Sequence, residues 1–293
     1  MNILLHRRVE HEMLELITAY FSEEDAERFK VKKISGSVWV AHGPEGIFYI
    51  KRRTEMELEE KLTSYLHERS IRVEMPHPAR HGGNMFWEDG CGYALYACIP
   101  GIRPGWEVPI MSAVGNTLAK LHSGFMHFPF EGVKTWDISP HTWEWILQCS
   151  HSPDARWARS VVKNFCSPDL EGGKQLVHGD VHPGNLLVDE EGDVGIIDFQ
   201  RLRVANRMAD IAYFCAHLII HNGISIPLIT AFLKGYGSES TFREGDGARF
   251  MHHLTMFIVQ YTFYLRKEPF AALSQLIEVS RAVEDLISPS RNA

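Results

Sequence analysis

The chain has 293 residues, of which 45% are hydrophobic, 23% charged and 11% aromatic. This composition is typical of a globular protein, and no repeat period of a solenoid is present, so disordered, fibrous and repeat architectures are excluded. With a formal charge of −7, the molecule lacks the positive electrostatic field that nonspecific nucleic-acid binding needs. We therefore expect no nucleic-acid partner. Five irregularly spaced cysteines without a C-x-x-C pair exclude a cysteine-based zinc site.

The N-terminal residues turn charged before an apolar run develops, and nowhere does an apolar run approach the roughly 18 residues of a membrane span. We therefore expect a cytoplasmic protein with no membrane partner. Apolar residues at helical spacing predict an opening helix over 9–21, and Ser22 followed by three acidic residues predicts the cap of a short second helical turn.

The next part of the chain predicts a small sheet with one inserted helix. Three β-rich runs at 29–34, 38–41 and 47–51 are separated by turn residues and indicate an antiparallel meander. A helix is predicted over 54–69, and two further apolar stretches at 84–87 and 93–99 flank a glycine-containing turn, as in a hairpin. About five strands and one helix result.

After Pro100-Gly101 the pattern becomes mainly helical. Short β-type runs at 175–178, 186–188 and 194–198 interrupt it and predict a small sheet within the helical part. The helices are expected at 110–122, 142–149, 156–165, 210–221, 226–236, 247–265 and 270–287.

The strongest chemical signal is His178-Gly179-Asp180, with Asn185 five residues after the aspartate and Asp198 in an Ile-Asp-Phe run thirteen residues later. The Asp-x-x-x-x-Asn interval is that of a kinase catalytic loop, in which the aspartate accepts the proton of the acceptor hydroxyl and the asparagine binds Mg²⁺. Asp198 then takes the place of the second metal ligand. Mg²⁺ prefers hard oxygen ligands, which an amide and a carboxylate supply.

These residues, together with 207–212, Leu118-Ala119-Lys120-Leu121-His122 and the 95–101 segment, resemble the aminoglycoside phosphotransferase and choline kinase family over most of the chain. The resemblance implies an α+β, bilobal, protein-kinase-like fold, with an N-terminal lobe of a five-stranded antiparallel sheet and one inserted helix, and a mainly helical C-terminal lobe. The implied domains are a nucleotide-binding lobe over 1–98 and a lobe over 99–293 that carries the catalytic loop and the acceptor pocket.

The resemblance also implies how the nucleotide is held. Lys51, at the end of the third strand, would contact the phosphates, and a glutamate on the next helix would pair with it. We expect Glu59, which shares an inward stripe with two leucines, with Glu55 as the reserve. Gly36 would present backbone N–H groups to phosphate, and the hinge residues Ala97 and Ile99 would bind adenine through their backbone.

The resemblance implies ATP and Mg²⁺ as cofactors and Asp180 as the catalytic base. The chain has no glycine-rich G-x-G-x-x-G loop and no Ala-Pro-Glu, which favours a hydroxyl of a small molecule as acceptor over a protein. The acceptor itself stays open between antibiotics, choline-like and amino alcohols, sugars and vitamin precursors, because pocket walls decide among them. We expect a monomer or weak homodimer.

Two alternatives stay open. His178, Asp180, His182 and Asp198 could instead bind transition metals in a hydrolase, or the fold could serve as a noncatalytic kinase-like scaffold. We expect His178 and His182 to fix the loop through hydrogen bonds, and His217 and His221 to be ordinary histidines rather than metal ligands. Asp210 suits a helix N-cap with Arg207 as an ion-pair partner.

Overall fold

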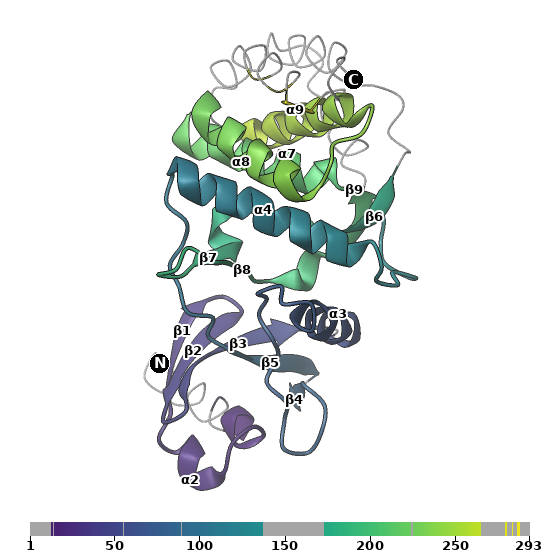
Figure 1. Ribbon diagram of the computed structural model, residues 1–293. Helices are drawn as coiled ribbons and strands as arrows, with labels where there is room; N and C mark the ends of the chain where they lie inside the picture. The colour runs from purple at the N-terminus through teal and green to yellow at the C-terminus, as the bar shows by residue number, and fades with distance from the viewer. Residues whose placement is uncertain are drawn as a thin grey trace. The chain divides into compact units, whose positions relative to one another are not determined.

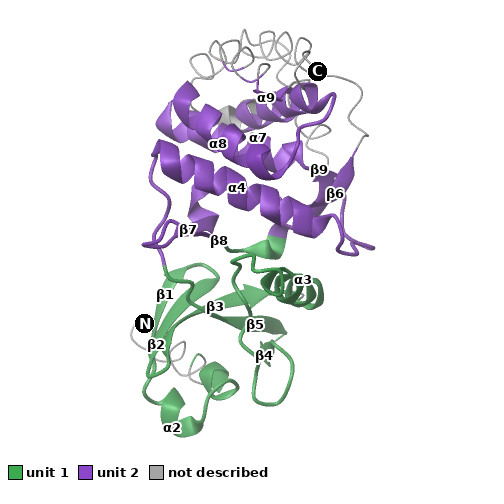
Figure 2. Cartoon of the chain, in the orientation of Figure 1, with its two compact units in different colours: residues 1–100, 195–200 green, residues 101–194, 201–293 purple. Residues whose placement is uncertain are grey.

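The computed structural model describes residues 15–54, 56–88, 90–136, 173–223 and 225–264, together with Met13, Val279, Val283, Leu286 and Ile287. The described chain divides into two compact units (Figure 2). Unit 1 comprises Met1–Pro100 and Gly195–Gln200, and unit 2 comprises Gly101–Val194 and Arg201–Ala293. The return of 195–200 to unit 1 places Asp198 there, although it lies far along the chain.

Unit 1 is built on a five-stranded antiparallel sheet in the order β1-β2-β3-β5-β4 (Figure 1). One helix, α3, follows β3 in the chain, so the predicted sheet with its inserted helix is confirmed. A short helix capped by Ser22, whose Oγ accepts from the Asp25 N–H at 3.1 Å, precedes the sheet as expected. The elements are α2 (Glu23–Ala26), β1 (Lys30–Ser35), β2 (Val38–Gly43), β3 (Gly46–Arg53), α3 (Glu57–His67), β4 (Phe86–Glu88) and β5 (Cys91–Ala97).

Strand β3 alternates between its two faces in a way that sets up the chemistry of unit 1. Phe48 and Ile50 are buried in an aromatic-rich core, as their apolar side chains favour. Lys51 and Arg53 are buried as well, and their spacing of two residues puts both side chains on the same face of the strand. Two cations buried on one face require anionic partners.

Unit 2 is mainly helical, with short strands near its polar loops (Figure 1). Strand β6 pairs antiparallel with β9. The sequence did not predict β9 as a strand of its own, because only four residues separate it from the apolar run at 194–198. The elements of this part of the chain are α4 (Val108–Phe125), β6 (Lys174–Val177), the 3-10 helix Pro183–Asn185, β7 (Leu186–Val188), β8 (Val194–Ile196), the 3-10 helix Phe199–Arg201, β9 (Arg203–Asn206), α7 (Met208–Asn222), α8 (Ile226–Glu239) and α9 (Asp246–Tyr264). Most residues of β8 and of the 3-10 helix Phe199–Arg201 belong to the 195–200 segment of unit 1.

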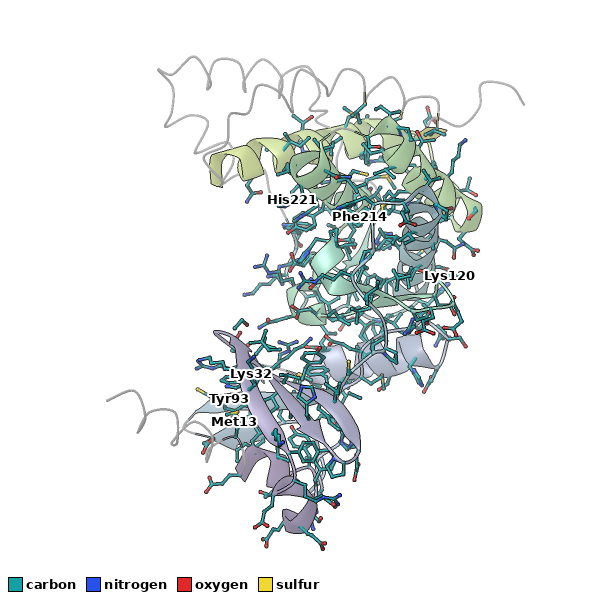
Figure 3. The ribbon with its side chains drawn as sticks, turned by 90° about the vertical axis from the view of Figure 1, so that its left-hand side faces the viewer. Met13, Lys32, Tyr93, Lys120, Phe214 and His221 are labelled. Atoms are coloured by element: carbon teal, nitrogen blue, oxygen red, sulfur yellow. The ribbon has the colours of Figure 1, made fainter. Side chains whose placement is uncertain are left out.

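Helices α4 and α8 approach closely, and two glycines allow it. A Cβ atom at Gly115 would lie 2.0 Å from the Phe232 carbonyl oxygen, and one at Gly235 would lie 2.0 Å from the Ser112 carbonyl oxygen. Phe214 of α7 is fully buried within this unit, whereas Lys120 on α4 is exposed (Figure 3). Among the helices of the described ranges, none combines the length and apolarity needed to cross a membrane. The helices expected at 142–149 and 156–165, and most of 270–287, lie outside the described residues.

Candidate active site

Lys51 of unit 1 is bound by Glu74 and not by Glu59. Its Nζ lies 2.8 Å from Glu74 Oε1 and 2.6 Å from Oε2, and both side chains are buried. Glu74 lies in the extended segment after α3, where Val73 forms a parallel bridge with Ile196. The expected Lys51–Glu59 pair was therefore wrong, because this long-range bridge brings a second carboxylate to the lysine. Glu55 lies outside the described residues.

Glu59 instead supports Arg53. Its Oε2 lies 3.3 Å from Arg53 Nε, and its Oε1 accepts from the Tyr96 hydroxyl at 2.8 Å. Burial raises the pKa of Glu59, and the neighbouring Arg53 charge opposes that rise. Lys51 Nζ also lies 4.8 Å from the centroid of the Tyr96 ring, so one tyrosine borders both cations.

Asp198 joins the same group of charges. Its Oδ1 lies 3.2 Å from Arg53 Nη2, and its backbone N–H donates to Glu74 Oε1. Asp198 has a φ of +69°, one of two positive values at non-glycine residues in the described ranges. Such a conformation costs on the order of 1–3 kcal/mol and is concentrated at functional sites. We refer to Lys51, Arg53, Glu59, Glu74 and Asp198 as the unit 1 charge cluster.

The other residues expected to bind nucleotide lie at or just beyond the ends of strands in the unit 1 sheet. Gly36 is exposed in the turn between β1 and β2, with open space where a Cβ atom would stand. Ala97 ends β5 opposite Phe48 of β3 and is exposed, and Ile99 follows two residues later. Their expected contacts with phosphate and adenine stay predictions.

In unit 2, Asp210 fixes the backbone of the 178–185 loop. It is fully buried, and its carboxylate accepts from the N–H groups of His178 at 2.8 Å and Gly179 at 2.9 Å, and from His122 Nε2 at 3.0 Å. Burial alone would raise the pKa of Asp210, but the His122 hydrogen bond and the nearby imidazoles hold that pKa below its usual value.

Two expectations about Asp210 were wrong. Helix α7 begins at Met208, so Asp210 lies in its first turn and not at the N-cap. Arg207 pairs with Asp246, at 2.8 Å between Nη2 and Oδ2, and not with Asp210. The Asp210 carboxylate instead bonds to His122 and to the backbone of the 178–185 loop, and so neither caps α7 nor pairs with Arg207.

Gly179 allows the loop to turn beside Asp180. Its φ is +78°, and a Cβ atom at this position would lie 2.1 Å from the Arg201 carbonyl oxygen. Any other residue would therefore be strained in backbone and in packing. His178 Nδ1 accepts from the Asp180 N–H at 3.2 Å, and His182 Nδ1 accepts from the Gly184 N–H at 3.0 Å, so both histidines stabilise the loop through hydrogen bonds, as expected.

Asp180 itself is held from several sides. Its Oδ1 accepts from the Tyr213 hydroxyl at 2.9 Å and lies 3.6 Å from Arg201 Nη1. Asn185 Nδ2 donates to the Asp180 carbonyl oxygen at 3.0 Å, which leaves its amide oxygen without a hydrogen-bond donor among the described residues. The Asp180 side chain is 14% exposed. A nearly buried but hydrogen-bonded carboxylate is suited to accept a proton.

A row of three imidazoles borders this loop. His182 stacks on His217 at 5.1 Å between ring centroids, and His217 stacks on His221 at 5.4 Å. Burial, together with His182 and His221, lowers the pKa of His217 to about 3, so His217 is neutral at physiological pH. Within the described ranges no group of three or more His, Cys, Asp or Glu side chains is arranged to hold a metal ion.

Sequence reasoning missed Glu74, Arg53 and Tyr213. Arg53 carried a usable signal, because it lies two residues after Lys51 in a strand and so shares its face. Glu74 and Tyr213 carried none locally, since each meets its partner through tertiary contacts 23 and 33 residues away in the chain.

Comparison with solved structures shows the same fold in small-molecule kinases. Spectinomycin phosphotransferase in complex with ADP and spectinomycin has a TM-score of 0.69 at 14% identity, covering 95% of this chain and 94% of that chain. A microcompartment-associated aminopropanol kinase has a TM-score of 0.64 at 16% identity, with coverage of 93% and 94%. Choline kinase from Streptococcus pneumoniae has a TM-score of 0.59 at 13% identity, with coverage of 94% and 99%.

One curated relative matches a shorter stretch. A probable acyl-CoA dehydrogenase of Arabidopsis thaliana is 38% identical over 68 residues, which is 22% of this chain and 8% of that protein. The match therefore shows a local likeness only.

The model of the phosphotransferase enzyme family matches residues 24–250, a range that includes Lys51, Asp180, Asn185 and Asp198. The chain therefore belongs to the phosphotransferase enzyme family, in the protein-kinase-like fold of the small-molecule kinases.

Proposed function

We propose that the protein transfers the γ-phosphoryl group of ATP, with Mg²⁺, to a hydroxyl group of a small molecule. The observation that carries this proposal is the Asp180 carboxylate, oriented by Tyr213 at 2.9 Å in a loop that Asp210 fixes through two backbone N–H groups. A general base must keep its geometry while it accepts the proton, and this loop is positioned by its backbone. The hydroxyl oxygen of the acceptor then forms a bond to phosphorus while ADP leaves.

Asn185 and Asp198 each carry an oxygen donor of the kind that binds a divalent cation. Asn185 keeps its amide oxygen available because its Nδ2 group donates to Asp180, and Asp198 offers a carboxylate whose side chain is 36% exposed. These are the hard oxygen ligands that Mg²⁺ prefers, with nucleotide phosphates and water completing its coordination. When bound, the ion would neutralise phosphate charge. AMP-PNP and Ca²⁺ are present in the structure of a similar amicoumacin kinase, which supports a nucleotide and a divalent ion here.

We further propose that Lys51 contacts the phosphates and that Glu74 holds it in place. Gly36 would approach the phosphates from the turn between β1 and β2, while Ala97 and Ile99 would bind adenine. Glu59 would act through Arg53, which it holds at 3.3 Å. The similar structures include kinases named for spectinomycin, for aminopropanol and for choline. The acceptor class proposed for this chain is accordingly a small molecule that carries a hydroxyl group.

The first experiment is a calorimetric titration of ATP with and without Mg²⁺, followed by transfer assays with labelled ATP over a panel of antibiotics, amino alcohols and sugars. We expect magnesium-dependent binding that Asp198→Ala abolishes. Binding without Mg²⁺ dependence would contradict the proposed metal site, and no binding at all would favour the noncatalytic scaffold.

With an accepted substrate in hand, Asp180→Asn should lower kcat by about 10²–10⁴, the usual contribution of a general base, with an unchanged melting temperature. Glu190→Gln is the matched control, because Glu190 is an exposed carboxylate in the same unit. Unchanged turnover in Asp180→Asn would contradict the role assigned to Asp180.

A further inference from the structure

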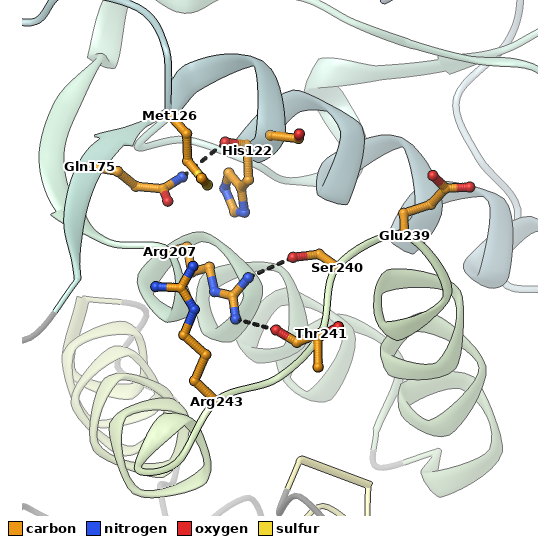
Figure 4. A pocket seen from close by; sticks show the side chains of 9 residues that line it. His122, Met126, Gln175, Arg207, Glu239, Ser240, Thr241 and Arg243 are labelled. Atoms are coloured by element: carbon orange, nitrogen blue, oxygen red, sulfur yellow. Dashed lines mark hydrogen bonds between the residues drawn. The ribbon is translucent and has the colours of Figure 1, made fainter.

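A separate polar cavity of about 230 Å³ lies in unit 2 (Figure 4). Its lining comes from four parts of the chain: the end of α4, β6, the residue before α7 and the loop between α8 and α9. The lining residues that matter for its chemistry are His122, Ser123, Gln175, Arg207, Thr241 and Arg243. Asp180, Asn185 and the unit 1 charge cluster do not line it.

The cavity has a fixed basic wall at Arg207. This guanidinium is buried, and it donates to Ser240 Oγ at 2.6 Å and to the Thr241 carbonyl oxygen at 2.8 Å (Figure 4). It also donates to Asp246 Oδ2 at 2.8 Å. Its charge is therefore compensated by Asp246 and its orientation is set before any ligand arrives. Preorganised groups lose little conformational entropy on binding.

Arg243 supplies a second guanidinium without an anionic partner. Its backbone N–H donates to Asp246 Oδ2 at 2.9 Å, but among the described residues no acceptor pairs with its side chain. The side chain is directed from the loop into the cavity (Figure 4). Among the described residues, the lining therefore combines the Arg207 guanidinium, which has a carboxylate partner, with the Arg243 guanidinium, for which no such partner is present.

The remaining walls suit an anion with several oxygens. Ser123 and Thr241 contribute hydroxyl groups to the lining. The one carboxylate in the lining, Glu239, accepts from Asn116 Nδ2 at 2.8 Å and lies at the other end of the cavity from the two arginines (Figure 4). Guanidinium and hydroxyl donors together suit the several oxygens of a phosphate group.

We propose that this cavity is a binding site for the phosphate group of a small molecule, with Arg243 as its principal cation and the Ser123 and Thr241 hydroxyls as further donors. The volume lies below the roughly 300–1,000 Å³ of pockets for drug-sized ligands, so the ligand is a small phosphate and not a nucleotide. This inference does not depend on the proposed function, because none of its residues takes part in phosphoryl transfer.

The test is a calorimetric titration of inorganic phosphate into the full chain without Mg²⁺. We expect saturable binding that Arg243→Gln weakens about tenfold or more, since it removes a charge-assisted hydrogen bond. The matched control is Lys234→Gln, which removes an exposed cation from α8 outside the cavity and should leave the affinity unchanged. On addition of phosphate, the side-chain Nε–H signals of arginine in a ¹⁵N spectrum should shift for Arg207 and Arg243.

Further variants separate this site from the active site. Asp198→Ala and Asp180→Asn should bind phosphate as the unchanged protein does, and their loss of binding would place the phosphate elsewhere and overturn the proposal. Equal affinity for acetate would overturn the assignment to phosphate. Equal phosphate affinity in Arg243→Gln and Lys234→Gln, or no saturation of the unchanged protein, would overturn the site itself.

Discussion

The unit 1 charge cluster and the 178–185 loop of unit 2 hold their carboxylates by different means. In unit 1, buried carboxylates face buried cations, as in Lys51–Glu74 at 2.6 Å. In unit 2, Asp180 and Asp210 accept mainly from a hydroxyl, an imidazole and backbone N–H groups. Removing one member of a buried ion pair leaves an uncompensated charge, whereas neutral donors can return to water or to other acceptors. Unit 1 is therefore expected to be sensitive in stability, and the loop in catalysis.

The largest expected effect on stability is that of Glu74→Gln. It leaves Lys51 buried without a counter-ion and should lower the free energy of unfolding by about 3–5 kcal/mol. Chemical denaturation measures this loss. The matched control is Glu57→Gln, because the Glu57–Lys61 pair has the same 2.6 Å separation but side chains that are 77% and 65% exposed; its melting temperature should not change.

A second variant tests whether charge compensation is the cause. The double change Lys51→Met with Glu74→Gln removes both charges and should recover part of the stability that Glu74→Gln loses. A double variant less stable than the sum of the two single variants would contradict the ion-pair explanation. Equal losses in Glu74→Gln and Glu57→Gln would contradict the contrast between buried and exposed pairs.

Asp210→Asn tests the hydrogen bonds by which Asp210 holds the 178–185 loop of unit 2. An amide cannot accept from three donors as the carboxylate does, and its NH₂ group would face the N–H of His178 or Gly179. We expect a loss of about 3 kcal/mol in the free energy of unfolding, together with lower turnover because the loop loses its support. Asp189→Asn is the control, since it keeps an oxygen for the Asp193 N–H, which lies 2.8 Å from Asp189 Oδ1 in an exposed turn. Full stability in Asp210→Asn would show that the loop does not rely on this carboxylate.

The five-stranded sheet with its inserted helix and the mainly helical second part could be predicted from the sequence, because local patterns of apolar and turn residues determine these elements. Alternation and turn residues placed the five strands of unit 1 and the short strands that flank the 178–185 loop. The errors share a cause. Glu74 reaches Lys51 through a bridge to Ile196, and Asp210 reaches His122 across 88 residues, so neither pairing leaves a periodic signal. Strand pairing and side-chain partners depend on tertiary contacts that local patterns do not encode.

The row of imidazoles beside the loop predicts a pH dependence. The pKa of His217 is about 3 in the folded protein, against an ordinary value near 6.5 in the unfolded chain. Between these values the unfolded chain binds the additional proton, so stability falls as the pH drops from about 6.5 toward 3. The expected loss is about 2 kcal/mol at pH 5 relative to pH 7.

His217→Phe should flatten this part of the stability profile, because phenylalanine retains a ring for stacking but cannot take up a proton. Urea unfolding at pH 5 and pH 7 measures the difference between the two conditions. His67→Gln is the control, since His67 is exposed and its loss should leave the slope unchanged. An equally steep profile in His217→Phe would assign the acid sensitivity to other groups.

The smallest expected effect is that of a variant at Tyr213, which tests the positioning of Asp180 separately from the stability of the fold. Tyr213→Phe removes the hydroxyl that donates to Asp180 Oδ1 at 2.9 Å and should lower kcat by about tenfold, which corresponds to about 1.4 kcal/mol in the activation free energy. Tyr236→Phe is the control, because it removes another buried hydroxyl, 2.9 Å from His122 Nδ1, without touching Asp180. An equal loss of kcat in both variants would mean that Tyr213 acts through general loosening of unit 2 and not through Asp180.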